Sequence, residues 1–83
     1  MSVLDKQFDA AVAASKNLDR PDNDTMLKLY ALYKQGTVGD VEGRRPGFTD
    51  MIGRAKYDAW AAVKGKTTDL ARRDYAALVD SLK

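Results

Sequence analysis

Two lysines and three tyrosines stand where helical spacing would place them on largely apolar surfaces. Tyr30, Tyr33 and Lys34 follow one another at i, i+3 and i+4, so they would crowd one patch of a helix. Lys56 interrupts an apolar face, and Tyr75 places a hydroxyl within an aliphatic stripe. Each has an ordinary explanation, because lysine extends its ammonium to water and a core tyrosine keeps one polar tip. Their conjunction in one small chain favours a binding site.

The chemistry of this set suits a ligand with three parts. Lysine offers a point charge to phosphate, and tyrosine or tryptophan offers a face to a planar base. Apolar side chains beside them would cover an alkyl chain, at about 0.8 kcal/mol for each buried methylene group. A nucleotide that bears a fatty tail satisfies all three requirements.

The composition argues against several kinds of chemistry. The chain has 83 residues with no His and no Cys, which excludes zinc fingers, Cys or Ser–His nucleophile systems and thiol redox reactions. We therefore expect no catalytic residue, no cofactor and no metal. The net charge of +2 is too small for the footprint of a nucleic-acid-binding protein. A partner with a few negative charges fits better.

The N-terminal sequence, MSVLDKQFDA, lacks the basic and apolar regions of a signal peptide. Uninterrupted apolar stretches are only a few residues long, so a membrane-spanning helix is not expected either. These features predict a soluble protein in the cytoplasm.

The elements that must position these residues are helices. Apolar residues recur at helical spacing in four segments: one that ends near residue 17, and three over about 22–35, 50–64 and 68–82. Carboxylates at 22–24 can cap the second helix, and Thr67 or Thr68 the fourth. The pattern predicts an all-α fold, a single four-helix bundle that forms one domain over residues 1–83.

The second helix presents more apolar surface than one neighbour would cover. Its apolar residues and Lys34 occupy an arc of roughly 220°, about twice the stripe that a surface helix usually buries. Either it packs against several partners, or a ligand covers part of it. The 14-residue loop over residues 36–49 that follows is long enough to return along this helix. The second and third helices can therefore run parallel.

The third helix is predicted to bury one face and to carry one unusual glycine. Its apolar face consists of Ile52, Ala55, Ala59, Trp60 and Val63. Gly53 costs helix stability, up to about 1 kcal/mol, and is expected to permit a close approach.

The sequence resembles the acyl-CoA-binding protein family over essentially its whole length. The matching residues are Phe8, Pro21, LYALYKQGTVGD from Leu29 to Asp40, RPG at 45–47, Asp50, GRAKYDAW at 53–60, Lys64-Gly65 and Tyr75. The resemblance implies an up-down-down-up bundle that binds long-chain fatty acyl-CoA without catalysis. It also implies an intracellular carrier and pool former in lipid metabolism, monomeric, with transient contact to acyl-CoA-using enzymes and no integral membrane association.

The resemblance also implies the ligand-binding residues, position by position. They are Tyr30, Tyr33, Lys34, Lys56, Tyr75, Lys16, Met26 and Leu27. The lysines at 34 and 56 and Tyr30 would serve the ribose 3′-phosphate, with the adenine close by. Tyr75 would contribute at the acyl-bearing groove, and Met26 and Leu27 would lie where the acyl chain is housed. Lys16 would approach the ligand from the end of the first helix.

Two positions depart from the family pattern, and other functions compete. Tyr57 stands where many members have Trp, and Gly36 where Ala is common. A helical protein-interaction module without a lipid ligand would use the wide apolar face to meet a partner helix. A helical nucleic-acid module is suggested by the isoelectric point near 9.0 and would bind with a steep salt dependence.

Overall fold

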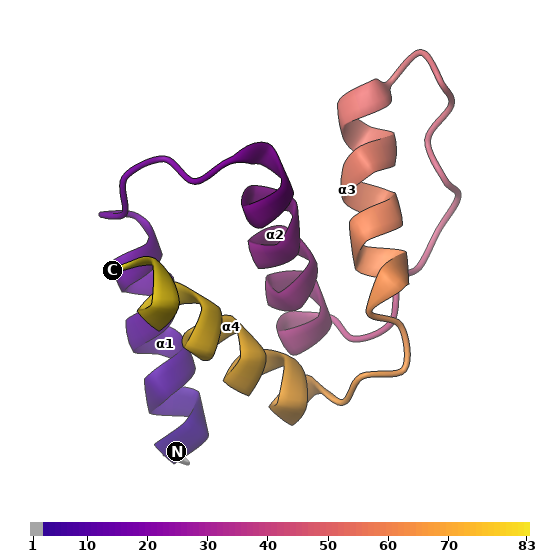
Figure 1. Ribbon diagram of the computed structural model, residues 1–83. Coiled ribbons are helices and arrows are strands. Elements are labelled where there is room, and N and C mark those ends of the chain that lie inside the picture. Colours follow the sequence, from indigo (N-terminus) through magenta and orange to yellow (C-terminus); the bar gives the residue numbers. More distant parts are fainter. Residues whose placement is uncertain (1–2) are drawn as a thin grey trace.

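The computed structural model describes residues 3–83 of the chain, and within this range it contains helices and no strand. The helices are α1 (Val3–Ser15), α2 (Asn23–Thr37), α3 (Met51–Ala62) and α4 (Thr68–Leu82). Figure 1 shows α2 and α3 running in the same direction, with the loop between them returning along the outer side of α3. The up-down-down-up arrangement and the parallel middle pair confirm the sequence prediction.

The helix α2 lies at the centre of the fold. It packs against α3 on one side and against α4 on another, while α1 packs against α4. The core therefore lies where α1, α2 and α4 meet, and its buried residues are Phe8, Ala11, Leu32, Ala71, Tyr75 and Val79. Two helical neighbours account for much of the wide apolar arc of α2, as one of the two sequence interpretations required.

The helix α3 has one helical neighbour, α2, and contributes no residue to this core. Trp60 is buried near its C-terminal end. Ile52, predicted to lie on the buried face, is 73% exposed. That prediction was wrong because an apolar face becomes a core only where a second element covers it, and nothing covers the first turns of α3.

The helix boundaries follow the capping residues. The carboxylate of Asp22 accepts a hydrogen bond from the Thr25 amide, and Thr67 caps α4 in the same way. Asp50 caps α3 by accepting from the Gly53 amide at 3.0 Å. A Cβ at position 53 would lie only 2.3 Å from the Asp50 carboxylate, so Gly53 makes room for the cap. The end of α3 falls at Ala62, two residues before the predicted end.

Gly36 does not begin the loop, as the sequence predicted, but lies buried inside α2. A Cβ at this position would lie 3.0 Å from Cγ of Arg72 on α4, so the glycine allows the two helices to cross closely. The Arg72 Nε atom donates to the carbonyl oxygen of Gly36 at 2.7 Å. Here glycine allows a close helix crossing in the last turn of α2.

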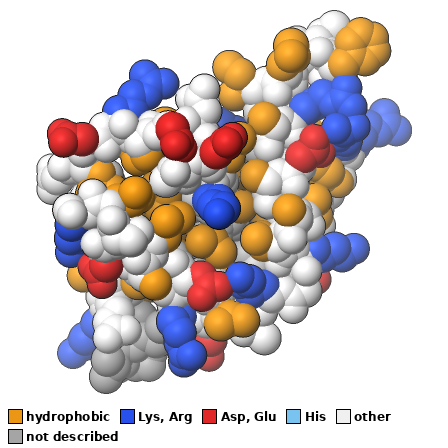
Figure 2. All heavy atoms as spheres, viewed as in Figure 1, with side chains coloured by type: hydrophobic (Ala, Val, Ile, Leu, Met, Phe, Trp, Pro, Cys, Tyr) orange, Lys and Arg blue, Asp and Glu red, His pale blue; other side chains and the backbone are white. Residues whose placement is uncertain are grey.

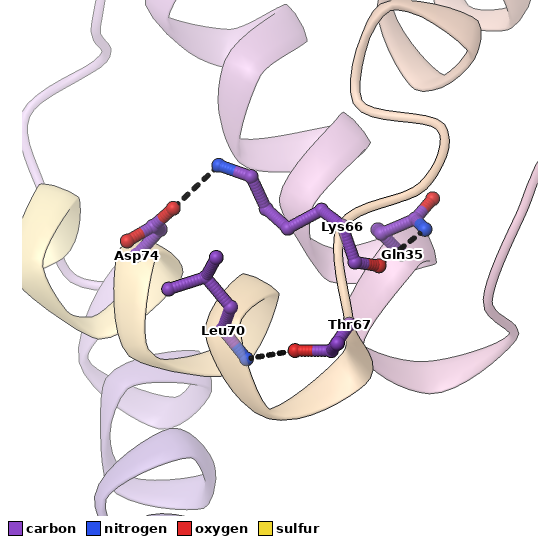
Figure 3. A network of polar contacts seen from close by, with 5 residues as sticks. All are labelled: Gln35, Lys66, Thr67, Leu70 and Asp74. Carbon is purple, nitrogen blue, oxygen red and sulfur yellow. Dashed lines mark hydrogen bonds and ion pairs between the residues drawn. The ribbon is translucent and has the colours of Figure 1, made fainter.

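Polar contacts hold the linker between α3 and α4 against α2. The buried Gln35 donates through Nε2 to the Lys66 carbonyl at 2.7 Å and to Asp40 Oδ1 at 2.8 Å. The same Asp40 oxygen accepts from the Gly65 amide at 2.8 Å. Figure 3 shows Gln35 beside the backbone of Lys66, whose ammonium reaches Asp74 of α4 at 2.5 Å.

The loop over residues 38–50 is fixed against α3 by side chains of that helix. The Trp60 indole donates to the Gly39 carbonyl at 2.7 Å. Arg45 donates through two nitrogens to the Asp58 carboxylate, at 2.7 and 2.8 Å. These contacts, with those of Asp40, hold α3 parallel to α2 across a long connection. Within residues 3–83, none of the helices is both long and apolar enough to cross a membrane.

Asp40 gives the fold a predicted acid sensitivity. The hydrogen bond from the Gly65 amide, followed by that from Gln35, lowers the pKa of the Asp40 carboxyl below its ordinary 3.8. The ionised Asp40 carboxylate therefore stabilises the fold. This contribution is fully present above pH 3.8 and is lost as the pH falls through the lower, folded-state pKa. We expect Asp40→Asn to lower Tm near neutral pH, and the difference from wild type to shrink below pH 3.8 in thermal unfolding followed by circular dichroism.

The matched control for this experiment is Glu42→Gln. Glu42 is an exposed carboxylate in the same loop and forms no salt bridge with any residue that the structure describes. Its Tm should stay close to wild type over the whole pH range. A Tm difference for Asp40→Asn that stayed constant from neutral to acid pH would contradict the role of the carboxylate charge.

Candidate ligand-binding site

A groove of about 580 Å³ lies between the first turns of α2 and α3. It is lined by Arg20, Asn23, Met26, Leu27, Tyr30, Met51, Ile52, Ala55 and Lys56. Most of these side chains are apolar, and the two charged ones are basic. Such a groove suits an apolar chain that carries an anionic group at one end.

A second cavity of about 280 Å³, which we call the tyrosine hollow, adjoins the groove. It is lined by Ser15, Pro21, Met26, Leu29, Tyr30, Tyr33 and Tyr75, which come from α1, α2, α4 and the loop after α1. Met26 and Tyr30 line both cavities, so the two adjoin at the first turns of α2. Tyr30 and Tyr33, which are more exposed than Tyr75, offer ring faces and hydroxyls to a planar, polar group.

Two lysine–aromatic pairs bridge α2 and α3 in opposite directions. Lys56 of α3 places its Nζ 5.6 Å from the ring centroid of Tyr30 on α2. Lys34 of α2 places its Nζ 5.0 Å from the ring centroid of Trp60 on α3. Each such cation–π contact is worth about 0.5–1 kcal/mol at an exposed site, less than a charge-assisted hydrogen bond to phosphate. An arriving phosphate can therefore attract both ammonium groups.

The core holds Tyr75 firmly in the wall of the hollow. Its side chain is only 4% exposed and packs edge-on against Phe8, with ring centroids 5.3 Å apart. Its hydroxyl donates to Ser15 Oγ at 3.1 Å, and that hydroxyl donates to the Val12 carbonyl at 2.7 Å. Tyr33 packs against the same Phe8 ring, yet it is 41% exposed and keeps a free edge toward solvent.

The structure brings together most of the residues predicted to bind ligand. Met26, Leu27, Tyr30, Tyr33, Lys56 and Tyr75 line the groove, the tyrosine hollow or both. Lys34 lines neither, but it follows Tyr30 by one helical turn and reaches α3 at Trp60. Lys16 is exposed and directly follows Ser15, which places it at the rim of the hollow.

A third cavity, of about 480 Å³, differs from the groove in its charges. It lies where α2, α3 and α4 meet, on the face seen in Figure 2, where hydrophobic side chains are interspersed with acidic and basic ones. Its lining includes Asp24 and Asp74 as well as Lys28 and Lys66. Because Lys66 is paired with Asp74, this cavity is a poor site for an anion.

Sequence reasoning missed several lining residues, including Arg20, Met51 and Ser15. Ile52 was assigned to the core, whereas it lines the groove. A signal for Ile52 was present, because it precedes Lys56 by four residues and so shares its helix face. Arg20 lies in the loop before α2, where helix periodicity does not predict the direction in which a side chain points.

Comparison with known proteins identifies the family of this chain. The family model described as "Acyl CoA binding protein" matches residues 5–79. The chain belongs to the acyl-CoA-binding protein family. It is 51% identical over 76 residues to acyl-CoA-binding protein homolog 1 of Caenorhabditis elegans, covering 90% of this chain and 88% of that protein. It is 46% identical over 72 residues to the acyl-CoA-binding protein of Saccharomyces cerevisiae, covering 87% and 83%.

Solved structures of family members have the same fold. The crystal structure of acyl-CoA-binding protein 2 of Oryza sativa superposes with a TM-score of 0.91 at 42% identity, covering 95% of this chain and 89% of that one. The solution structure of the acyl CoA binding protein of Babesia bovis gives 0.80 at 37% identity, covering 98% and 93%. The family and the four-helix fold predicted from sequence are confirmed.

Both departures from the family pattern lie outside the two cavities. Tyr57 donates through its hydroxyl to the Gly43 carbonyl at 3.1 Å and so helps to hold the loop. Gly36 serves the crossing with α4. Among the described residues, no group of three or more His, Cys, Asp or Glu side chains is placed to hold a metal ion.

The hydroxyl of Tyr75 should matter for stability. We expect Tyr75→Phe to lower the free energy of unfolding by about 0.5–1.5 kcal/mol, because it removes the bond to Ser15 while keeping the ring. Urea unfolding with an unchanged m-value measures this difference. Tyr30→Phe is the matched control, since Tyr30 lines the same hollow and is less buried. Equal losses of unfolding free energy in the two variants would contradict a stabilising role of the Tyr75 hydroxyl.

Proposed function

We propose that this protein binds long-chain fatty acyl-CoA, one molecule per chain, and acts as a carrier and pool former in lipid metabolism. The observation that carries the proposal is the pair of lysine–aromatic contacts beside a groove whose charged lining is purely basic. A partner helix, the competing interpretation, would use the apolar walls but would leave the two cross-helix lysines without a role. Membership of the family also favours the acyl-CoA ligand.

In this proposal the nucleotide head binds where Lys34 of α2 and Lys56 of α3 each reach the opposite helix. Lys34, Lys56 and Tyr30 hold the ribose 3′-phosphate, and the adenine lies close by, against the exposed edge of Tyr33. Lys16 approaches from the rim at the end of α1. The contacts that hold both ammonium groups before binding are weak, so their loss offsets little of the gain from phosphate.

The acyl tail occupies the groove between α2 and α3. Met26 and Leu27 form its α2 wall, and Met51 and Ile52 form its α3 wall. Two methionines adapt to a flexible chain, because their unbranched thioethers fill irregular gaps. The thioester then lies between the groove and the tyrosine hollow, near Tyr75.

We propose a binding protein rather than an enzyme. Thioester hydrolysis or transfer needs an activated nucleophile or a general base. The sequence has no His or Cys, and no carboxylate lines the groove or the hollow. The proposal includes a cytoplasmic monomer that meets acyl-CoA-using enzymes transiently.

The lysines provide the first test of the function. Lys34→Ala and Lys56→Ala should each weaken palmitoyl-CoA binding about ten- to hundred-fold, because each removes a charge-assisted contact to phosphate. Isothermal titration calorimetry measures the affinity, and far-ultraviolet circular dichroism should show unchanged helix content. Lys28→Ala is the matched control, since Lys28 is exposed on α2 but lines the third cavity instead.

The ligand panel separates the function from its competitors. Palmitoyl-CoA should bind more tightly than either free CoA or palmitate, because the head and the tail act together. Equally weak binding of all three would contradict the proposal. Loss of helix content in both lysine variants would mean that these residues are structural.

The groove provides the second test. In a series of saturated acyl-CoA ligands, each added methylene should strengthen binding about four-fold, from about 0.8 kcal/mol per buried group, until the chain outgrows the groove. Met26→Ala should flatten this series and leave free CoA binding unchanged. Leu70→Ala is the matched control, because Leu70 is 42% exposed, against 41% for Met26, and lines neither the groove nor the hollow. Affinity that does not change with chain length would place the tail elsewhere.

A further inference from the structure

Three large hydrophobic side chains are left uncovered at one end of the molecule. Phe48, Met51 and Ile52 are 78%, 77% and 73% exposed, well above the other exposed large hydrophobic residues. They lie in the last turn of the loop and the first turn of α3, and we call them the apolar tip. Figure 1 shows this end of α3 projecting away from α1 and α4, and Figure 2 shows hydrophobic side chains gathered there beside a basic cluster.

The charge around the apolar tip is strongly basic. Residues 43–56 contain four basic side chains and one acidic one, a net charge of +3, whereas the other residues contain ten and eleven. The one carboxylate, Asp50, is engaged in capping α3. Arg45 is paired with Asp58, but Arg44 and Arg54 form no salt bridge with the residues that the structure describes. When Asp58, the partner of Arg45, is included, this end carries a net charge of +2, which equals the net charge of the whole chain.

We propose that the apolar tip docks on the surface of an anionic lipid bilayer. Exposed apolar side chains beside arginine and lysine match the boundary between acyl chains and anionic headgroups. The tip is convex and projects from the fold, so it would enter a lipid surface more readily than it would bury area against a folded protein. Contact of this kind is peripheral and involves no spanning helix.

The apolar tip is continuous with the groove, because Met51 and Ile52 belong to both. Docking would therefore bring the mouth of the groove to the headgroup layer, where an acyl chain can pass between lipid and protein without crossing water. This loading role rests on the proposed function. The docking itself rests only on the exposed side chains and the charges around them.

The test is co-sedimentation of the full chain, without ligand, with phosphatidylcholine vesicles that contain or lack phosphatidylserine. Wild type should bind the anionic vesicles preferentially, and added salt should weaken binding. Phe48→Ser should reduce binding about ten- to hundred-fold, the loss expected for one fully inserted aromatic side chain. Phe48 lies outside the groove, in a turn, so the variant should keep the fold. Arg44→Glu should act in the same direction.

The control is Val38→Ser, which removes an apolar side chain that is exposed at the other end of the loop. Equal vesicle binding by wild type and Phe48→Ser would overturn the proposal, as would equal binding to neutral and anionic vesicles. Self-association in sedimentation velocity that Phe48→Ser abolishes would assign the tip to a second copy instead. Calorimetry with soluble acyl-CoA should give the same affinity for wild type and Phe48→Ser, so failure to dock and failure to bind ligand are separate results.

Discussion

The packing of α3 against a single neighbour is the constraint on which the rest of the structure depends. A helix with one partner buries a narrow stripe, and it needs further contacts to hold its angle. Here those contacts lie at its C-terminal end, where Trp60 bonds to Gly39 and Asp40 bonds to Gly65. At the other end no second helix covers the exposed Met51 and Ile52 of α3, and the groove opens there. The end of α3 that has no second neighbour thus forms one wall of the proposed binding surface.

The free protein keeps its two cross-helix lysines in partly favourable positions. An ammonium group left among apolar walls would be costly, whereas one placed over an aromatic face loses less on leaving water. Lys34 and Lys56 each reach the opposite helix, so each contact also helps to bridge α2 and α3. The same arrangement keeps the charges near the groove without pairing them to carboxylates. A carboxylate partner would hold them more tightly and would repel a phosphate.

The fold was largely predictable from the sequence, because helix periodicity and caps are local properties. The caps at Asp22, Asp50 and Thr67 follow from residue type alone. The errors arose where the role of a residue depends on another residue that is distant in the sequence. Gly36 reads locally as a helix stop, but its role depends on Arg72, 36 residues further along the chain. The apolar pattern predicts that Ile52 is a core residue. The pattern does not show whether a second element covers that face of the helix.

The candidate site was predictable to a different degree. Tyr30, Tyr33 and Lys34 stand out by spacing, but the roles of Lys16, Met26 and Leu27 came from resemblance, since nothing local distinguishes them from surface or core residues. Arg20 and Met51 escaped both arguments, because a groove wall is formed by elements that meet only in the folded chain.

Net charge is the property whose meaning changes most between sequence and structure. A value of +2 spread evenly would say little about partners beyond being small for a nucleic-acid footprint. The folded chain instead gathers +2 around the first turns of α3, with Asp58 counted against its partner Arg45, and leaves the remainder neutral. A local positive field of this kind extends about a Debye length, roughly 8–10 Å, into solvent. It therefore acts on any anion that approaches the mouth of the groove, whether that anion is a single phosphate or a headgroup layer. Arg44 contributes to this field but lines neither cavity. A substitution at Arg44 that weakens the field should therefore slow ligand arrival more than it speeds ligand release.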